Sequence, residues 1–169
     1  MSAEILPSFQ EDYSSSTARS SERRKVIGLI HSGAFFHNPK RFQASLSLSV
    51  YPEMLTPYTI EELAQMKLFQ LQGYNIGFAL KRTEDEFNEI VAVHNNSQIP
   101  NIGIPLLQAA VRAGGVYLNH FGTQKLNDLY ESVGFVEIHR EEYNPEFDPE
   151  ELFAKRYGKL PVIYRKFQV

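Results

Sequence analysis

The stretch AVHNNSQIPNIGIPLL, residues 92–107, joins a β-type run to an apolar helix and so decides how the middle of the chain folds. The run ends at polar residues, after which Pro100 and Pro105 stand on either side of Gly103. A loop followed by a helix N-terminus can hold a phosphate group, because its main-chain N–H groups point at the ligand. Each proline removes one such donor. The stretch alone leaves open whether it binds a cofactor, has lost that ability, or only reverses the chain.

Regular elements are predicted on both sides of this loop. An acidic linker at 83–87 separates two runs of strand-forming residues, 74–82 and 88–96, which predicts a β-hairpin. Residues 103–115 predict a helix, because apolar side chains recur on one face and two glycines end the segment. The remaining elements are a strand at 116–121, a helix at 124–133, and strands at 135–143 and 160–169 around a polar insertion at 144–159. Strands and helices mixed in this order predict an α/β (or α+β) fold.

Three further elements are predicted before the hairpin. The apolar run KVIGLI, residues 25–30, predicts a strand. In residues 44–52 leucine and valine alternate with serine, which is typical of a half-buried strand. Thr59 followed three residues later by Glu62 is a capping-box pattern, which predicts that a helix begins within 56–68.

The composition predicts one soluble domain with an N-terminal arm. Hydrophobic residues make up 43% of the 169 residues, which is enough for a core. Residues 1–25 contain seven serines and few apolar side chains, so we predict an arm before a single domain at 26–169. No apolar run approaches the ~20 residues of a membrane span, and the N-terminus lacks the pattern of a secretion signal. The absence of cysteine suits the cytoplasm, and a net charge of −3 gives no general attraction to nucleic acid.

Two motifs in the second half of the chain have a recognisable spacing. Gln98, Asn101 and Gly103 stand three and two residues apart, and a pair of leucines follows. Further on, LYESVGF (129–135) combines a tyrosine with a Gly-Phe pair. In this spacing the chain resembles the GNAT superfamily of N-acetyltransferases over residues 74–143. The runs AGG, LYESVGF and EEYNPEF are also similar to acetyltransferase-like proteins encoded by phages and mobile elements.

The resemblance implies a GNAT-like mixed, mostly antiparallel sheet flanked by helices, and acetyl transfer from acetyl-CoA, the co-substrate, to an amine by direct attack. The strand before the loop would hold the pantetheine arm through main-chain groups, and the helix N-terminus would hold the pyrophosphate. In this assignment the cofactor-binding residues are Ala92, Val93, His94, Gln98, Asn101, Ile102 and Gly103. The catalytic residues would be Tyr130, which protonates the departing thiolate, and Glu89, the general base of some relatives. No metal is implied.

Some of these residues depart from the family pattern or have a simpler structural interpretation. Asn101 replaces a glycine, although asparagine tolerates the left-handed backbone conformation better than most residues. Tyr130 could be a core aromatic, Glu89 a solvent-facing strand residue, and His94 could contribute only main-chain atoms. The alternative function is a catalytically inactive GNAT-fold assembly protein, for example in a phage virion rather than the cytoplasm. It would use residues 1–25 to contact other chains or a second copy of itself. The acceptor amine is not identified, and neither nucleic acid nor a membrane is an expected partner.

Overall fold

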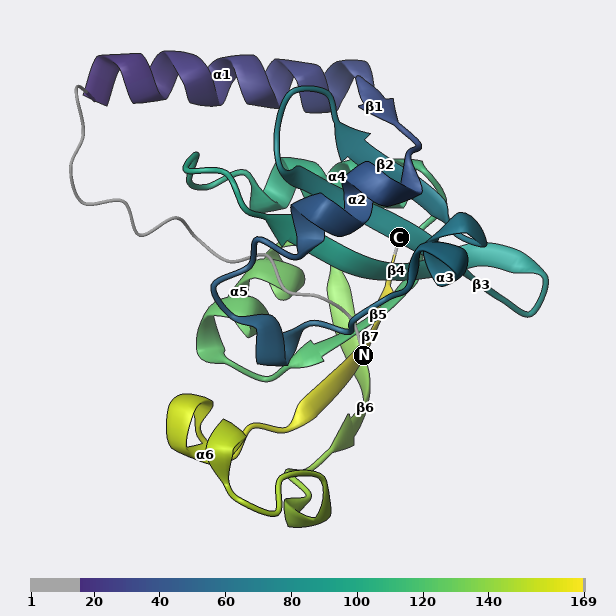
Figure 1. Cartoon of the computed structure of the whole chain (residues 1–169), viewed down its shortest axis with the longest axis vertical. Helices are drawn as coiled ribbons and strands as arrows, with labels where there is room; N and C mark the ends of the chain where they lie inside the picture. The colour runs from purple at the N-terminus through teal and green to yellow at the C-terminus, as the bar shows by residue number, and fades with distance from the viewer. Residues whose placement is uncertain (1–15, 169) are drawn as a thin grey trace.

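The computed structural model describes residues 16–168, which form one open β-sheet with helices on both faces (Figure 1). Seven strands in this part of the chain are ordered β1-β2-β3-β4-β5-β7-β6 across the sheet. The strands are β1 (Phe35–Phe36), β2 (Lys67–Leu71), β3 (Ile76–Thr83), β4 (Glu86–Asn95), β5 (Tyr117–Phe121), β6 (Phe135–Glu141) and β7 (Val162–Phe167). The helices are α1 (Ser16–Ser32), α2 (Pro39–Leu46), α3 (Ile60–Ala64), α4 (Gly103–Arg112), α5 (Gln124–Val133) and α6 (Leu152–Tyr157), with 3-10 turns η1 (Pro52–Met54) and η2 (Pro145–Phe147).

The pairing of β4 with β5 divides the sheet into two halves. The other neighbouring strands in it are antiparallel, whereas β4 and β5 are parallel. Their register consists of Glu89 opposite Tyr117, although β4 continues to Asn95 and β5 to Phe121. In Figure 1 the β1–β4 half and the β5–β7–β6 half run in different directions. The sheet is therefore open between the carboxyl ends of β4 and β5. The predicted α/β (or α+β) class, with a mixed, mostly antiparallel sheet flanked by helices, is confirmed.

Two hydrophobic cores lie on opposite faces of the sheet. On one face α1, α4 and α5 bury apolar side chains such as Ile30, Leu106 and Leu126 against the strands. On the other face α2 and α3 contribute Phe42 and Leu63. Both faces are therefore covered by helices whose apolar side chains recur at helical spacing.

Elements with strong local signals occur where they were predicted. The hairpin is β3–β4, and the helices predicted at 103–115 and 124–133 are α4 and α5. Both hydrogen bonds of the capping box between Thr59 and Glu62 are present at the start of α3. Gly134 has a φ of 114° and ends α5 in the left-handed conformation that glycine adopts without strain. These signals act within a few residues, so the sequence alone is sufficient to specify them.

The strand predicted at 25–30 is wrong, because these residues belong to α1. Val26 and Ile30 are four residues apart and therefore lie on one face of a helix. They are 0% and 1% exposed, packed in the core with α4. A short apolar run cannot distinguish a buried strand from a helix.

The strand predicted at 44–52 is also wrong. α2 continues to Leu46, and Leu48 and Val50 beyond it are 56% and 63% exposed, so the alternating pattern does not mark a half-buried strand. The strand β2 was missed, because residues 67–68 were assigned to the end of the preceding helix. α3 ends at Ala64, which releases the chain in time to form β2.

The predicted arm is described only in part, since residues 1–15 lie outside the described residues. The predicted boundary between residues 25 and 26 falls inside α1, a helix of 17 residues. The described portion of the arm is thus helical and continuous with a helix that packs on the sheet.

The polar insertion is folded onto the turn η1. Glu53 accepts hydrogen bonds from Arg156 Nη1 and from the Tyr157 hydroxyl, both at 2.6 Å. The ring of Phe153 packs on Phe121, the last residue of β5, with centroids 4.8 Å apart. These contacts hold α6 beside the open end of β5.

Candidate functional site

β4 is irregular at the residues predicted to bind the pantetheine arm. Its register with β3 shifts between Gly77 and Ala79, and Ala92 has a φ of 53°. A non-glycine residue in this left-handed region costs roughly 1–2 kcal/mol, so surrounding contacts must hold it there. Ala92 and Val93 are 0% and 1% exposed. The irregularity bends β4 beyond the point where its pairing with β5 ends.

His94 holds this bend through both ring nitrogens. Nδ1 donates to the Ala92 carbonyl oxygen at 2.9 Å, which leaves Nε2 to accept from the Ser45 hydroxyl of α2 at 2.7 Å. Burial lowers the pKa of His94 to about 4, so the ring is neutral at pH 7. The side chain of His94 therefore acts as a structural support, and one main-chain acceptor predicted to serve a ligand, the Ala92 carbonyl, accepts from it.

The loop after β4 is built by hydrogen bonds between side chains and the main chain. Asn95 accepts from the Ser97 amide at 3.2 Å and donates to the Ile99 carbonyl oxygen at 2.7 Å. Asn101 has a φ of 58°, the left-handed conformation expected of the residue that replaces a glycine. Gln98 is exposed at the surface of the loop. The loop thus has a defined shape that does not depend on a ligand.

The N-terminus of α4 follows this loop directly. Gly103 is its first residue, and Ile102 before it provides no side-chain cap. Pro105 lies in the first turn, where its missing N–H breaks no intrahelical hydrogen bond. Arg23 of α1 reaches over the loop and donates to the Asn101 carbonyl oxygen from Nε at 3.3 Å and from Nη2 at 3.0 Å. The tertiary structure therefore adds a positive charge to the predicted phosphate loop.

The two predicted catalytic residues belong to opposite faces of the sheet. Tyr130 of α5 is 1% exposed, and its ring centroid lies 4.5 Å from that of His120, in the core that contains α4. Glu89 of β4 acts on the other face, where its charge adds to the effect of burial in raising the pKa of Tyr58 to about 12. The predicted acid and base are therefore not brought together on one face.

Glu89 also lines a surface pocket of ≈ 450 Å³ at the start of β4 and β5. Tyr117 forms part of the same wall, and the hairpin contributes further carboxylates. The negative charge of Glu89 contributes to the raised pKa of Tyr164 as well. A cationic group would be favoured in these surroundings.

A buried pair that was not predicted consists of His120 on β5 and Arg165 on β7, which are 0% and 2% exposed. Arg165 donates to the His120 ring, and the two residues are 45 positions apart. A signal was present: Leu118 and His120 share one side of β5, and Ile163 and Arg165 share one side of β7. A polar residue on the apolar side of a strand indicates a buried polar contact.

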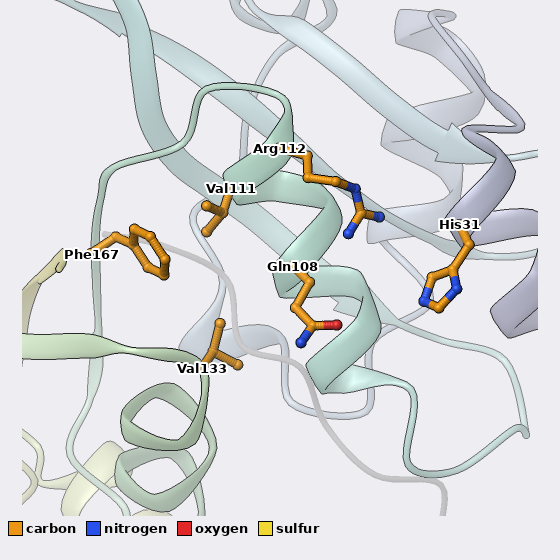
Figure 2. Close-up of a pocket in the computed structure, with 6 residues that line it drawn as sticks. All are labelled: His31, Gln108, Val111, Arg112, Val133 and Phe167. Carbon is orange, nitrogen blue, oxygen red and sulfur yellow. The ribbon is translucent and has the colours of Figure 1, made fainter. Parts of the chain in front are cut away.

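Figure 2 shows a second surface pocket, of ≈ 520 Å³, near the far end of α4. It is lined by His31, Gln108, Val111, Arg112, Val133 and Phe167. Its α4 residues extend from Gln108 to Arg112, roughly 7 to 13 Å along the helix axis from Gly103 at 1.5 Å per residue. This pocket is therefore separate from the predicted phosphate loop.

Comparisons with protein-family models, with curated proteins and with solved structures found no match. No helix within residues 16–168 is long and apolar enough to cross a membrane. The same residues contain no group of three or more His, Cys, Asp or Glu side chains that could hold a metal ion. The function is therefore inferred from the residues and geometry of the candidate site.

Proposed function

We propose that this protein is an acyl-CoA-dependent N-acyltransferase of the GNAT type, which transfers an acetyl group from acetyl-CoA to an amine. The observation that carries the proposal is the divergence of β4 from β5 immediately before a loop and the N-terminus of α4. A strand without a neighbour on one edge offers main-chain groups to an extended amide-bearing arm. A helix N-terminus at the end of that strand suits the pyrophosphate to which the arm is attached.

The loop has fewer main-chain donors than a glycine-rich loop, and Arg23 compensates for part of this loss. Pro100 and Pro105 have no N–H group. The Arg23 guanidinium is held within hydrogen-bond distance of the Asn101 carbonyl oxygen and adds charge at the same place. A guanidinium is well suited to phosphate because its donors form a planar fork.

The proposed chemistry is a direct attack in which the acceptor nitrogen bonds to the thioester carbonyl carbon as the C–S bond breaks. Tyr130 gives its phenolic proton to the departing thiolate. The nitrogen, now bonded to the acetyl carbon, releases its extra proton to water, and a proton from water returns the Tyr130 phenolate to the phenol, so that the protons balance. The acidic surroundings of Glu89 support an acceptor that approaches as a cation, which loses one proton to Glu89 or to water before its neutral nitrogen attacks.

One observation favours the alternative function, a catalytically inactive assembly protein. Tyr130 and Val93 are each 1% exposed, whereas a general acid and a ligand-binding strand must be reached by substrate. In this alternative the loop has kept its spacing but lost its ligand. Calorimetric titration with CoA distinguishes the two functions: measurable heat with saturation supports the transferase. The alternative follows if the wild-type protein gives no heat and no shift in melting temperature in millimolar CoA.

Tyr130→Phe tests the chemical role directly. Because a general acid contributes typically 10²–10⁴-fold, we expect turnover to fall at least ~10-fold while affinity for CoA stays nearly constant. The assay is release of free CoA thiol in the presence of a panel of amines, with thermal unfolding as the control for folding. Equal turnover of wild type and Tyr130→Phe would remove Tyr130 as the acid.

A further inference from the structure

A buried polar network joins α5 to the C-terminal half of the sheet. The Arg165 guanidinium donates from Nε to His120 Nε2 at 2.8 Å and from Nη1 to the Phe135 carbonyl oxygen at 3.0 Å. From Nη2 it donates to Asn127 Oδ1 at 3.1 Å and pairs with Glu131 Oε1 at 3.4 Å. Asn127 and Glu131 both belong to α5. Arg165 therefore fixes the orientation of this helix on the sheet.

The same contacts define the state of His120. Arg165 is a donor only, so Nε2 of His120 carries no proton, and Nδ1 donates to the Phe121 carbonyl oxygen at 2.7 Å. Burial lowers the pKa of His120 to about 4, the charge of Arg165 acts in the same direction, and Glu137 opposes it. His120 is therefore a neutral ring with one fixed tautomer.

Tyr130 rests on this network. Its ring lies 4.5 Å from that of His120, with an angle of 31° between the planes, and meets Phe135 edge-on at 6.3 Å. Asn127, Tyr130 and Glu131 are three and four residues apart, so they share one face of α5. The helix face that carries Tyr130 is thus the face that Arg165 anchors.

We propose that His120 and Arg165 are positioning residues for Tyr130, which fix its ring for proton donation without taking part in the reaction. The inference rests on the proposed function. The Arg165 guanidinium is only 2% exposed, whereas its ion-pair partner Glu131 is 62% exposed and its side-chain partner His120 is neutral. Burying this charge costs desolvation free energy that joining a helix to a sheet does not require. Apolar residues would join them at least as well. The neutral His120 ring, which Arg165 holds in place, instead supplies a flat surface against the phenol ring.

The kinetic test uses two variants, each also combined with Tyr130→Phe. Arg165→Met keeps much of the side-chain volume without its donors, and Arg165→Lys keeps the charge and one donor group. Since small misplacements of a reacting group can cost up to about 10²-fold, we expect Arg165→Met to lower kcat roughly 10- to 100-fold with KM for acetyl-CoA nearly unchanged. The decrease in kcat should be smaller for Arg165→Lys. In the Tyr130→Phe background the loss should nearly disappear, whereas equal losses in both backgrounds would overturn the inference.

A pH profile adds a readout that a merely structural role would not change. In Arg165→Met, His120 loses both the donor to Nε2 and the opposing charge of Arg165, while Glu137 remains, so its pKa should rise from about 4 although burial still lowers it. We expect an acidic limb in kcat for Arg165→Met that is absent from wild type and from Arg165→Lys. Nitrogen NMR of the five histidines reports the protonation state directly. If NMR shows that His120 of Arg165→Met titrates but kcat has no acidic limb, the positioning role is contradicted.

Failure of the proposed function gives a different pattern. If CoA does not bind, or if Tyr130→Phe is fully active, Tyr130 is not the general acid. The packing of its ring can still be measured. NMR of ¹³C-labelled tyrosine rings, assigned with Tyr130→Phe, then decides: a shifted Tyr130 signal in Arg165→Lys supports the positioning, and an unchanged signal overturns it. Should thermal unfolding show that Arg165→Met does not fold, Arg165→Lys carries both the kinetic and the NMR readouts.

Discussion

Ala92 and Asn101 share a left-handed backbone conformation, with φ values of 53° and 58°, for different physical reasons. Ala92 has no side-chain group that could stabilise this conformation, so it is held by its neighbours, above all by the hydrogen bond from His94 to its carbonyl oxygen. Asn101 adopts the conformation more readily by itself. The conformation of Asn101 could therefore be predicted from its residue type, whereas no sequence signal indicates the conformation of Ala92.

Substitutions in the loop at Asn101 and Gly103 should change the affinity for CoA. In Asn101→Gly the backbone keeps its conformation while the side chain no longer occupies space near the phosphates, so CoA should bind roughly two- to five-fold more tightly. Gly103→Glu should abolish binding through bulk and through repulsion of the pyrophosphate. Titration calorimetry measures both, and melting curves without ligand show whether the variants fold. Unchanged affinity in both variants means that the loop is not the phosphate site.

At the scale of elements, α1 is the largest departure from the sequence analysis and the one with most consequence for the site. The described part of the predicted arm, from residue 16, and the predicted strand at 25–30 form a single helix. Its inner face packs on α4 through residues such as Val26 and Ile30, and Arg23 lies over the loop. Helices this long are stabilised mainly by packing of an apolar face, which depends on what the face meets.

Arg23→Gln tests the contribution of α1 to the site. Loss of the guanidinium should weaken CoA binding roughly 3- to 10-fold and reduce its salt dependence, because the proposed site then lacks one charge-assisted contact to phosphate. Arg24→Gln is a matched control on the same helix. Arg24 is exposed, and its substitution removes the same charge as Arg23→Gln. Titrations at two ionic strengths separate the local contact from general electrostatic attraction. Equal effects of the two substitutions would argue that only net charge matters.

Ile30→Ala tests whether α1 belongs to the core. Ile30 is 1% exposed, so its truncation should lower the free energy of unfolding by about 2–5 kcal/mol. Chemical denaturation measures this, with Ile27→Ala, at a half-buried position on the same helix, as the milder control. A change below ~0.5 kcal/mol for Ile30→Ala would show that α1 contributes little to stability.

At the scale of the whole molecule, each face of the sheet contains a buried neutral histidine. His94 lies on the face covered by α2, and His120 lies on the face covered by α5. Burial lowers the pKa of both from 6.5 to about 4. The unfolded chain therefore binds more protons than the folded one between these values. The contribution of these two neutral histidines to the free energy of unfolding is therefore fully present above pH 6.5 and decreases as the pH falls towards 4.

The expected loss by pH 4 is roughly 3 kcal/mol for each histidine. Urea denaturation at several pH values measures it, because the free energy of unfolding should decline continuously from pH 6.5 to 4. His120→Gln should flatten the curve by about half, provided that the variant folds at pH 7. A free energy of unfolding that is constant over this range contradicts neutral burial of both rings.

The elements whose signals are local could be predicted from the sequence. The Thr59–Glu62 capping box, the β3–β4 hairpin and the amphipathic α4 each depend on residues a few positions apart, so spacing was sufficient. The loop conformation at Asn101 belongs to the same group. Mixed element order was sufficient for the fold class.

Features that join distant parts of the chain depend on tertiary packing and could not be predicted from the sequence. Residues 25–30 became a helix because Val26 and Ile30 meet the α4 side of the core. Arg23 reaches a loop 78 positions away, and His120 meets Arg165 across 45 positions. Such contacts form only when packing compensates for the entropy of bringing distant segments together, and no local pattern encodes that balance. The opening between β4 and β5, on which the proposed site depends, likewise lies between two strands that α4 separates in the chain.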